Sequence, residues 1–276
     1  MKTLNRILSL CAAALLCLCA CSAPGSRLVI LHANDTHSHL DPERDGTGGI
    51  IERAAYVDSV RARRGAKNVL LMHAGDFDQG TSYYSQMHGR LEAKMLDALG
   101  YDAVALGNHE FDDGIEDLTE RLRDVKCPVV CANLDLSSFE LGQYVKPYTI
   151  VNKGGMKIGI IGLEADISTC VAKVTSSRIP QFDAAEVTNK WAKFLREEEK
   201  CDMVILLSHF GYVGEPEGAP DDQTLIAKSR GVDLVVSGHS HTFVDDFIYI
   251  KDLDGKSVPI ITDGCWGLDM GMIKIY

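Results

Sequence analysis

The sequence lacks an excess of positive charge, because 28 Lys and Arg residues stand against 39 Asp and Glu residues, giving a formal net charge of −11. A nucleic-acid duplex is bound mainly through basic side chains that neutralise its phosphates. A duplex is therefore not expected as the main partner. A small phosphorylated substrate stays open, because a bound metal ion can outweigh the overall charge locally.

The sequence also lacks a paired-cysteine framework, although it contains nine cysteines. Four of them precede residue 22, and the other five are odd in number and include no Cys-x-x-Cys pair. This pattern argues against disulfide and zinc-finger frameworks. We interpret most of the five as small core residues. They are Cys127, Cys131, Cys170, Cys201 and Cys265.

The first 20 residues have the pattern of an export signal. Lys2 and Arg6 precede the apolar run 7–20, which is shorter than a comfortable membrane span. The run ends in Leu-Cys-Ala-Cys, which resembles a bacterial lipoprotein signal and implies lipidation of Cys21. A signal cleaved elsewhere, which leaves Cys21 without a role, is the alternative. We expect an exported lipoprotein anchored to the cell membrane or outer membrane and facing the periplasm.

The small and turn-forming residues Ser-Ala-Pro-Gly-Ser at 22–26 predict a short tether at 21–27. After residue 27 the sequence contains no repeat, low-complexity tract or interior linker, which predicts one domain at 28–276. β-rich apolar runs alternate with helical patterns in its first half, an order typical of parallel strands covered by helices. Strands are expected at 28–33, 68–74, 102–106 and 128–134, and helices at 49–63, 85–100 and 115–124.

The second half mixes hairpins with the same alternation. A hairpin is predicted at 148–164, and antiparallel strands around Asp254-Gly255 are predicted to include the final segment MGMIKIY. One sheet holding all these strands would be large. The expected fold class is therefore α/β, with two packed mixed sheets flanked by helices. The remaining predicted elements are helices at 184–199 and 223–229 and strands at 203–208 and 233–238.

Five of these strands end in polar side chains. In open α/β sheets, ligands bind beyond the carboxyl ends of the strands, so these side chains are expected to converge. Carboxylate, imidazole and amide groups together suit Zn²⁺, Mn²⁺ or Fe²⁺. The set exceeds the needs of one tetrahedral ion and suits two ions sharing a carboxylate. The candidates are Asp35, His37, Asp76, Asn108, His209, His239 and His241.

Two spacings within this set support convergence. Asp35-x-His37 and His239-x-His241 would place alternate residues on one side of an extended segment. Four other histidines lie inside apolar strands or in polar surroundings, and we interpret them as ordinary core or surface residues. These are His32, His73, His39 and His88.

The motifs DTH, GD, GNHEFD, SHFG and GHSH, taken together, resemble the calcineurin-like metallophosphoesterase superfamily and, more narrowly, the catalytic domain of bacterial 5′-nucleotidases. The resemblance extends from about residue 28 to residue 276. It implies the four-layer sandwich of that superfamily. It also implies two metals: Asp35, His37, Asp76 and His241 would bind one, and Asp76, Asn108, His209 and His239 the other.

The resemblance further implies the chemistry. Metal-bound hydroxide would attack the phosphorus of a phosphate monoester, most simply a nucleoside 5′-monophosphate, and His109 would protonate the leaving oxygen. Asp112 would orient His109, Asn108 and His109 would contact the substrate, and Glu110 would hold the loop. Gly107 is expected to allow a tight turn off the strand.

Several alternatives stay open. The same site would serve a cyclic-nucleotide phosphodiesterase or a phosphatase of broad specificity, and the alternative outside enzymes is a metal-binding lipoprotein. Family 5′-nucleotidases carry a second, C-terminal domain that binds the nucleobase. We expect a separately encoded chain resembling that domain to dock near Asn108, His109 and His209, with a stand-alone phosphatase as the alternative.

Overall fold

The computed structural model describes residues 27–214 and 217–276, so the predicted signal at 1–20, the lipidation site Cys21 and most of the tether lie outside the described residues. The first of two six-stranded sheets has the strand order β12-β1-β2-β3-β4-β5. Strands β1 to β5 run parallel, and β12 pairs antiparallel with β1. Their bounds are β1 Leu28–Ala33, β2 Val69–His73, β3 Ala103–Ala105, β4 Val129–Val130, β5 Val145–Lys146 and β12 Gly271–Ile275.

The second sheet has the order β10-β11-β9-β8-β7-β6. Its inner strands β7, β8, β9 and β11 run parallel, and the outer strands β6 and β10 are antiparallel to their neighbours. Both sheets are thus mixed, as the sequence predicts. The bounds are β6 Tyr148–Lys153, β7 Met156–Glu164, β8 Met203–His209, β9 Leu234–Ser237, β10 Ile248–Lys251 and β11 Ser257–Ile261.

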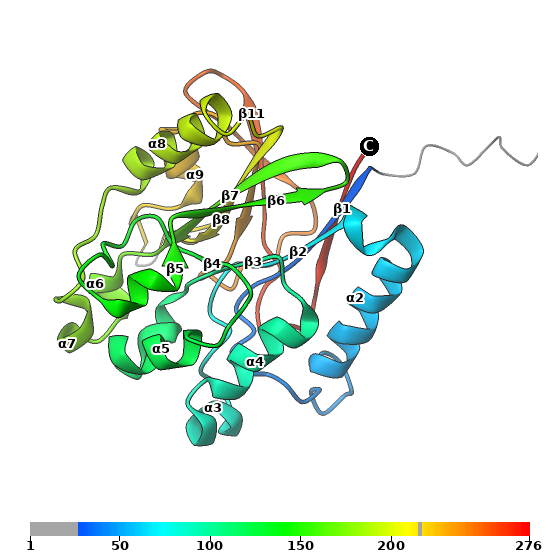
Figure 1. The fold of residues 1–276 in the computed structure, drawn as a ribbon, viewed down its shortest axis with the longest axis vertical. Helices are drawn as coiled ribbons and strands as arrows, with labels where there is room; N and C mark the ends of the chain where they lie inside the picture. The colour runs from blue at the N-terminus through cyan, green and yellow to red at the C-terminus, as the bar shows by residue number, and fades with distance from the viewer. Residues whose placement is uncertain (1–26, 215–216) are drawn as a thin grey trace, which may run out of the picture.

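Helices cover the outer faces of both sheets (Figure 1). Helices α2, α4 and α5 pack against the first sheet, and α8 and α9 pack against the second. The predicted four layers, helix, sheet, sheet and helix, are confirmed. The bounds are α2 Ile50–Arg64, α3 Ser82–Met87, α4 Arg90–Leu99, α5 Gly114–Leu122, α6 Ile167–Cys170, α7 Lys173–Ser176, α8 Ala184–Glu197 and α9 Asp222–Ile226.

Alternation along the strands explains this layering, because successive side chains point to opposite faces of a sheet. Ile30 of β1 lies in the core between the two sheets, whereas its neighbour Leu31 packs beneath the outer helices. In β8, Ile205 faces the central core and Leu206 faces the helices over the second sheet. Both faces of β1 and of β8 are therefore buried.

Three predicted elements differ from the structure. The helix predicted at 85–100 is split into α3 and α4, because His88 and Gly89 adopt left-handed φ values of 49° and 71°. The strand predicted at 128–134 is confined to β4. The predicted antiparallel hairpin at Asp254-Gly255 is confirmed, but the final segment MGMIKIY leaves it and pairs with β1 of the first sheet.

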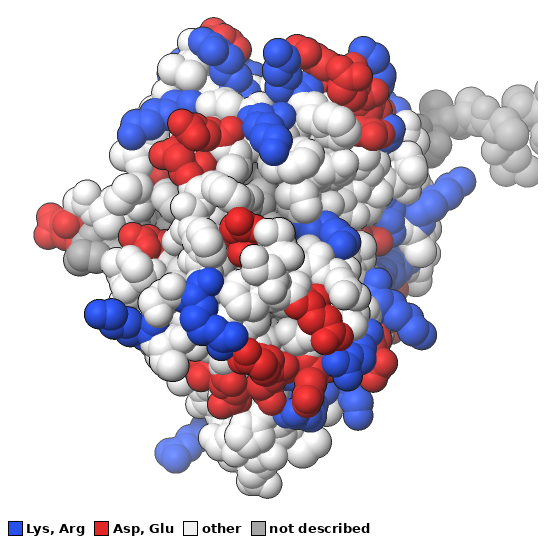
Figure 2. All heavy atoms as spheres, turned by 60° about the vertical axis from the view of Figure 1, so that its left-hand side comes forward, with Lys and Arg blue, Asp and Glu red and all other residues white. Residues whose placement is uncertain are grey.

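The surface of the described residues carries both charge signs. Figure 2 shows basic and acidic side chains interspersed over one face, with an acidic group in its lower half. Within the described ranges, no helix is long and apolar enough to span a membrane. Cys127, Cys131 and Cys201 are buried and free, as the core interpretation predicts, and Cys170 and Cys265 are free and half-buried.

Candidate metal centre

The structure brings all seven predicted ligands together at the carboxyl ends of β1, β2, β3, β8 and β9. Their ligand atoms form overlapping groups in which every atom lies within 4.8 Å of the others. Asn108 joins them through its side-chain oxygen, which lies 2.9 Å from Nδ1 of His239. The first group is Asp35, His37 and His241, and the second group is Asp76, His209 and His239. A further group, His37, Asp76 and His109, overlaps both.

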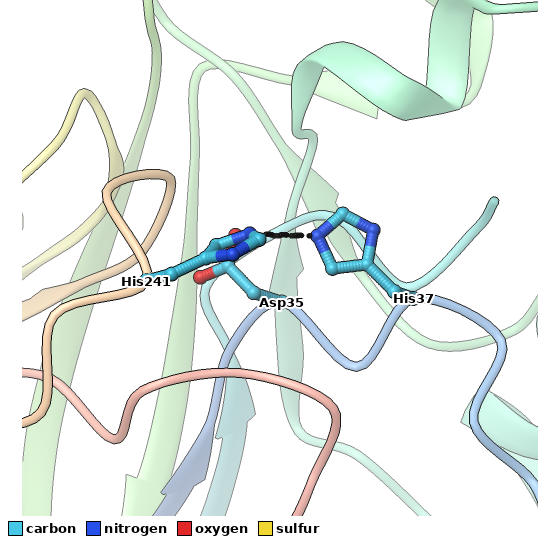
Figure 3. A group of neighbouring side chains, drawn as sticks. All are labelled: Asp35, His37 and His241. Atoms are coloured by element: carbon cyan, nitrogen blue, oxygen red, sulfur yellow. Dashed lines mark hydrogen bonds and ion pairs between the residues drawn. The ribbon is translucent and has the colours of Figure 1, made fainter. Parts of the chain in front are cut away.

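The first group faces a single point between three side chains. Figure 3 shows the imidazoles of His37 and His241 directed at each other, with the carboxylate of Asp35 beside them. The two Nε2 atoms are 2.9 Å apart, and Nε2 of His241 lies 3.5 Å from Oδ1 of Asp35. Asp35 is completely buried, whereas the side chain of His241 is 42% exposed. The group therefore opens towards solvent on the His241 side.

The second group is deeper. Nδ1 of His209 lies 2.7 Å from the carbonyl oxygen of Ala74 and donates its proton to it. Nε2 of His209 is then the ligand atom, and it lies 3.1 Å from Oδ2 of Asp76. Nε2 of His37, from the first group, lies 3.8 Å from the same oxygen. Asp76 thus lies between the two groups.

Charge in this site is concentrated and buried. Burial raises the pKa of Asp35 to about 7. Burial by itself would lower the pKa of His209, but the carboxylates of Asp76 and Asp35 outweigh it and raise that pKa well above its ordinary value. Burial lowers the pKa of His37 and of His239 to about 4, so both imidazoles are neutral at pH 7 and offer lone pairs.

These residues fit divalent cations by their chemistry. Two buried carboxylates converge with neutral imidazole nitrogens and an amide oxygen, a donor set that suits borderline divalent ions. Nε2 of His209 is buried and forms no hydrogen bond of good geometry, and it is paired by charge with the carboxylates of Asp76 at 3.1 Å and Asp35 at 3.8 Å. A buried polar atom of this kind is costly unless it finds a partner. A cation bound between these groups would supply that partner.

The backbone at the proposed ligands is not extended, in contrast to the prediction from the Asp35-x-His37 and His239-x-His241 spacings. Asp35 and His37 have φ values of 47° and 44°, and His239 and His241 have φ values of 68° and 49°. These segments are left-handed turns, so the extended-segment interpretation is wrong. Asp76 shares the conformation, with φ of 54°. Such backbone strain at non-glycine residues concentrates at functional sites, where the surrounding structure holds it in place.

Glu110 holds the loop, as predicted. It is fully buried, and its two oxygens accept hydrogen bonds from the backbone N–H groups of Gly107, Asp76, Phe77 and Asp78. One carboxylate thereby joins the loop after β2 to the loop after β3. This side chain therefore helps to set the backbone positions of Asp76 and of Gly107.

Gly107 is required for a reason other than the predicted turn. Its φ of −118° and ψ of 177° are extended values that any residue adopts. A β carbon at this position would instead overlap the backbone nitrogen and Oδ1 of Asp76. Glycine is therefore needed so that the two loops can approach each other, and the tight-turn explanation is wrong.

His109 and Asp112 form the predicted pair at the edge of the site. Nδ1 of His109 lies 2.9 Å from Oδ2 of Asp112, and both side chains are about one-third exposed. The backbone N–H of His109 donates to Oδ1 of Asp76. Burial opposes protonation of His109, but the hydrogen bond to Asp112 and the charge of Asp76 outweigh it and raise its pKa to about 9. Before any cation binds, His109 is therefore a proton donor at neutral pH.

The four histidines interpreted as ordinary residues have other partners. His32 lies 2.5 Å from Asp263, and Nε2 of His73 is hydrogen-bonded to the hydroxyl of Thr36. His39 and His88 contact the carboxylates of Glu43 and Asp113. None of the four belongs to the metal-ligand groups found among the described residues.

The fold and this site together define a metallophosphoesterase, and comparison with known proteins agrees. The calcineurin-like phosphoesterase family matches residues 28–243. The chain is 31% identical to the snake venom 5′-nucleotidase of Gloydius brevicauda over 299 residues, covering 98% of this chain and 48% of that protein. The solved 5′-nucleotidase precursor from Thermus thermophilus is 34% identical, with a TM-score of 0.80, covering 89% of this chain and 50% of the other.

A third relative is the Haemophilus influenzae NAD nucleotidase, with 29% identity and a TM-score of 0.76 over 89% of this chain and 52% of that one. This chain therefore belongs to the calcineurin-like phosphoesterase family, a class of hydrolase, as its motifs predict. It spans about half the length of the curated relatives it matches.

Proposed function

We propose that this chain is the catalytic part of a 5′-nucleotidase-type phosphomonoesterase that uses two divalent cations, Zn²⁺, Mn²⁺ or Fe²⁺. The observation that carries the proposal is the position of Asp76, one oxygen of which faces His37 from the first group and His209 from the second. Two of the compared relatives are named 5′-nucleotidases, which favours a nucleoside 5′-monophosphate as the substrate.

The proposed ligand sets share Asp76. Asp35, His37, Asp76 and His241 would hold one cation, and Asp76, Asn108, His209 and His239 the other. When bound, such ions neutralise phosphate charge and lower the pKa of a water molecule towards about 7. Asp76, 2% exposed, would bridge the two, and the opening beside His241 would admit the substrate phosphate.

The proton on the leaving oxygen comes from His109 in this proposal. Its Nδ1 is engaged by Asp112, so Nε2 carries the proton that is free for transfer. Asp112 fixes the ring orientation and favours the charged imidazole, while Asn108 and His109 contact the phosphate. A protein that only binds metal needs no such pair beside its ligands, which argues against the alternative of a metal-binding lipoprotein.

Hydrolysis assays on the purified chain test this function. We expect Mn²⁺- or Zn²⁺-dependent release of phosphate from nucleoside 5′-monophosphates, and loss of activity with a chelator. Nucleoside diphosphates, cyclic nucleotides, p-nitrophenyl phosphate and its bis ester complete the substrate series. Faster hydrolysis of cyclic nucleotides and the bis ester would instead identify a phosphodiesterase. Equal rates on all monoesters would identify a broad phosphatase, and no metal-dependent hydrolysis of any ester would overturn the proposal.

We also propose export and lipid anchoring through Cys21, a position outside the described residues. The support is the charged, apolar and small-residue order of residues 1–20. Labelled palmitate is expected in the full-length protein produced in a Gram-negative bacterium and recovered from membranes. A Cys21→Ser variant should lose the label, and a Cys19→Ser variant should keep it. Equal labelling of both variants would contradict this role for Cys21.

Nucleobase recognition is proposed to involve a second domain. The compared relatives carry about as much chain again outside the matched part. We propose that a separately encoded chain resembling the 5′-nucleotidase C-terminal domain docks at the edge near Asn108, His109 and His209.

A further inference from the structure

Asp222 is a fully buried carboxylate that links two strands behind the candidate metal centre. Its Oδ1 accepts a hydrogen bond of 2.7 Å from the hydroxyl of Ser208, and its Oδ2 accepts one of 2.5 Å from the hydroxyl of Ser237. The two serines are register partners on the parallel strands β8 and β9. All three residues are 0% exposed. One side chain therefore joins the carboxyl ends of two neighbouring strands.

Both strands lead directly into proposed ligands. Ser208 immediately precedes His209, and Ser237 lies two residues before His239. The rings of His209 and His239 lie 5.2 Å apart between centroids and belong to the same ligand group with Asp76. The separation and direction of these strand ends consequently decide whether the two imidazoles meet at one cation.

The loop after His209 is attached to the same carboxylate. The backbone N–H of Phe210 donates to the hydroxyl of Ser208 at 3.1 Å, and the backbone N–H of Asp222 donates to the carbonyl of Gly211 at 2.8 Å. Asp222 thus fixes the chain on both sides of His209.

Helix capping does not account for Asp222. The N-cap of α9 is Asp221, whose side chain accepts a hydrogen bond from the backbone N–H of Thr224. A second carboxylate is not needed for that function, and burying one is costly unless it is well hydrogen-bonded. In the sequence Asp222 is indistinguishable from an ordinary acidic residue at the start of a helix, so no sequence pattern indicates its role.

We propose that Asp222 is a positioning residue for the cation held by Asp76, His209 and His239. This inference rests on the proposed function. Asp222 touches neither cation nor substrate, and it acts by holding the ends of β8 and β9 at the separation that the two imidazoles require. The cation of the Asp35, His37 and His241 group should be affected less, because two of these three ligands, Asp35 and His37, follow β1, which lies in the other sheet.

Calorimetric titration of the metal-free chain with Mn²⁺ tests the inference without measuring catalysis. The wild type should bind two ions. Asp222→Ala should keep one with an affinity close to that of the wild type and bind the other about 10–100-fold more weakly, the usual effect of losing a group that orients metal ligands. Asp222→Asn keeps the size and one acceptor oxygen, so a smaller loss is expected.

Two further variants complete the test. The double variant Ser208→Ala/Ser237→Ala removes both hydrogen bonds and should weaken the same single ion. Asp222→Asn, which keeps an acceptor for one serine hydroxyl, should show the same selective weakening if neither of the other variants folds. Ser229→Ala is the matched control, because Ser229 is also fully buried near α9 but its hydroxyl donates to the carbonyl of Leu225 and not to Asp222. It should bind both ions normally.

Normal binding of both ions by Asp222→Ala or by the double serine variant would overturn the inference. Equal weakening of both ions would do the same, because it would indicate a general structural role. A wild type that binds no divalent ion would overturn the proposed function itself and the inference with it. Two normal ions in the wild type without phosphatase activity would leave the positioning role standing and overturn only the reaction.

Discussion

Gly107 and Asp76 lie so close that a β carbon on Gly107 would come within 2.9 Å of Cγ of Asp76 and would overlap its Oδ1. The backbone of the loop after β3 therefore packs at Gly107 directly against the backbone nitrogen and the carboxylate of Asp76 in the loop after β2. Asp76 is the proposed bridge between two cations, so the exact placement of its carboxylate depends on a residue that contributes no functional group.

A Gly107→Ala variant is accordingly expected to lose both stability and metal. Overlap with a buried neighbour costs about 1–3 kcal/mol in unfolding free energy, and displacement of Asp76 should weaken both cations. Urea unfolding and Mn²⁺ titration measure these effects. Gly46→Ala is the control, because Gly46 has φ of 88° but no atom within 4 Å of an added β carbon. It should lose about 1–2 kcal/mol and keep both ions. Unchanged stability and metal binding in Gly107→Ala would contradict the close-packing explanation.

Asp76→Asn tests the bridge directly. The substitution preserves shape but removes the charge and half of the ligand oxygens that two cations would share. We expect weaker binding of both ions and no measurable turnover. Metal content after dialysis, together with AMP hydrolysis, provides the measurement. A variant that retains two tightly bound ions and near-normal activity would show that Asp76 is not the bridge.

His109→Asn tests the proton donor. Metal content should stay normal, and the rate on AMP should fall by about 10²–10⁴-fold, the usual contribution of a positioned general acid. The loss should be smaller on p-nitrophenyl phosphate, whose leaving group needs protonation less. His88→Asn is the control, because His88 lies 2.9 Å from Asp113, in the same arrangement as His109 with Asp112, but outside the ligand groups. Equal losses on the two substrates would exclude the proton-donor role.

Glu110→Gln tests the carboxylate that holds the two loops. A glutamine amide has one acceptor oxygen and two donors, so it would leave some of the four backbone N–H groups facing another donor. We expect a loss of about 1–3 kcal/mol in unfolding free energy and weaker metal binding. Glu140→Gln, at an exposed position, is the control and should change neither. Normal thermal unfolding and metal content in Glu110→Gln would show that the loops are held by other contacts.

The proposed partner domain predicts a change in the Michaelis constant. Without it, the chain should bind nucleotides weakly and distinguish poorly between adenosine, guanosine and ribose 5-phosphates, because base stacking worth about 1–3 kcal/mol is missing. With it, the Michaelis constant for AMP should fall by about tenfold or more. Steady-state kinetics with the purified chain, alone and mixed with candidate chains, gives the answer. Micromolar and strongly base-selective constants for the chain alone would contradict the need for a partner.

Residue patterns along the chain are enough to predict the α/β class and the sheet edge at which the site forms. Each β-rich run that leads into Asp35, Asp76, Asn108, His209 and His239 is buried on both faces, so polar side chains that are to meet a ligand are expected at the strand ends. Parallel strands place their carboxyl ends at one edge, which explains why convergence was predictable from the strand order. The carboxylate, imidazole and amide groups at these strand ends then indicate a divalent metal ion by their chemistry alone.

The division of these side chains into two ligand groups, and the contacts that hold each group, depend on the tertiary structure. Left-handed turns at Asp35, His37 and His239 redirect side chains in a way that residue spacing does not reveal, because positive φ in a non-glycine residue is imposed by surrounding contacts. The close approach at Gly107 and the link made by Asp222 depend on contacts between residues distant in sequence. Local patterns report burial and strand periodicity, whereas these relationships arise only when separate strands are packed side by side.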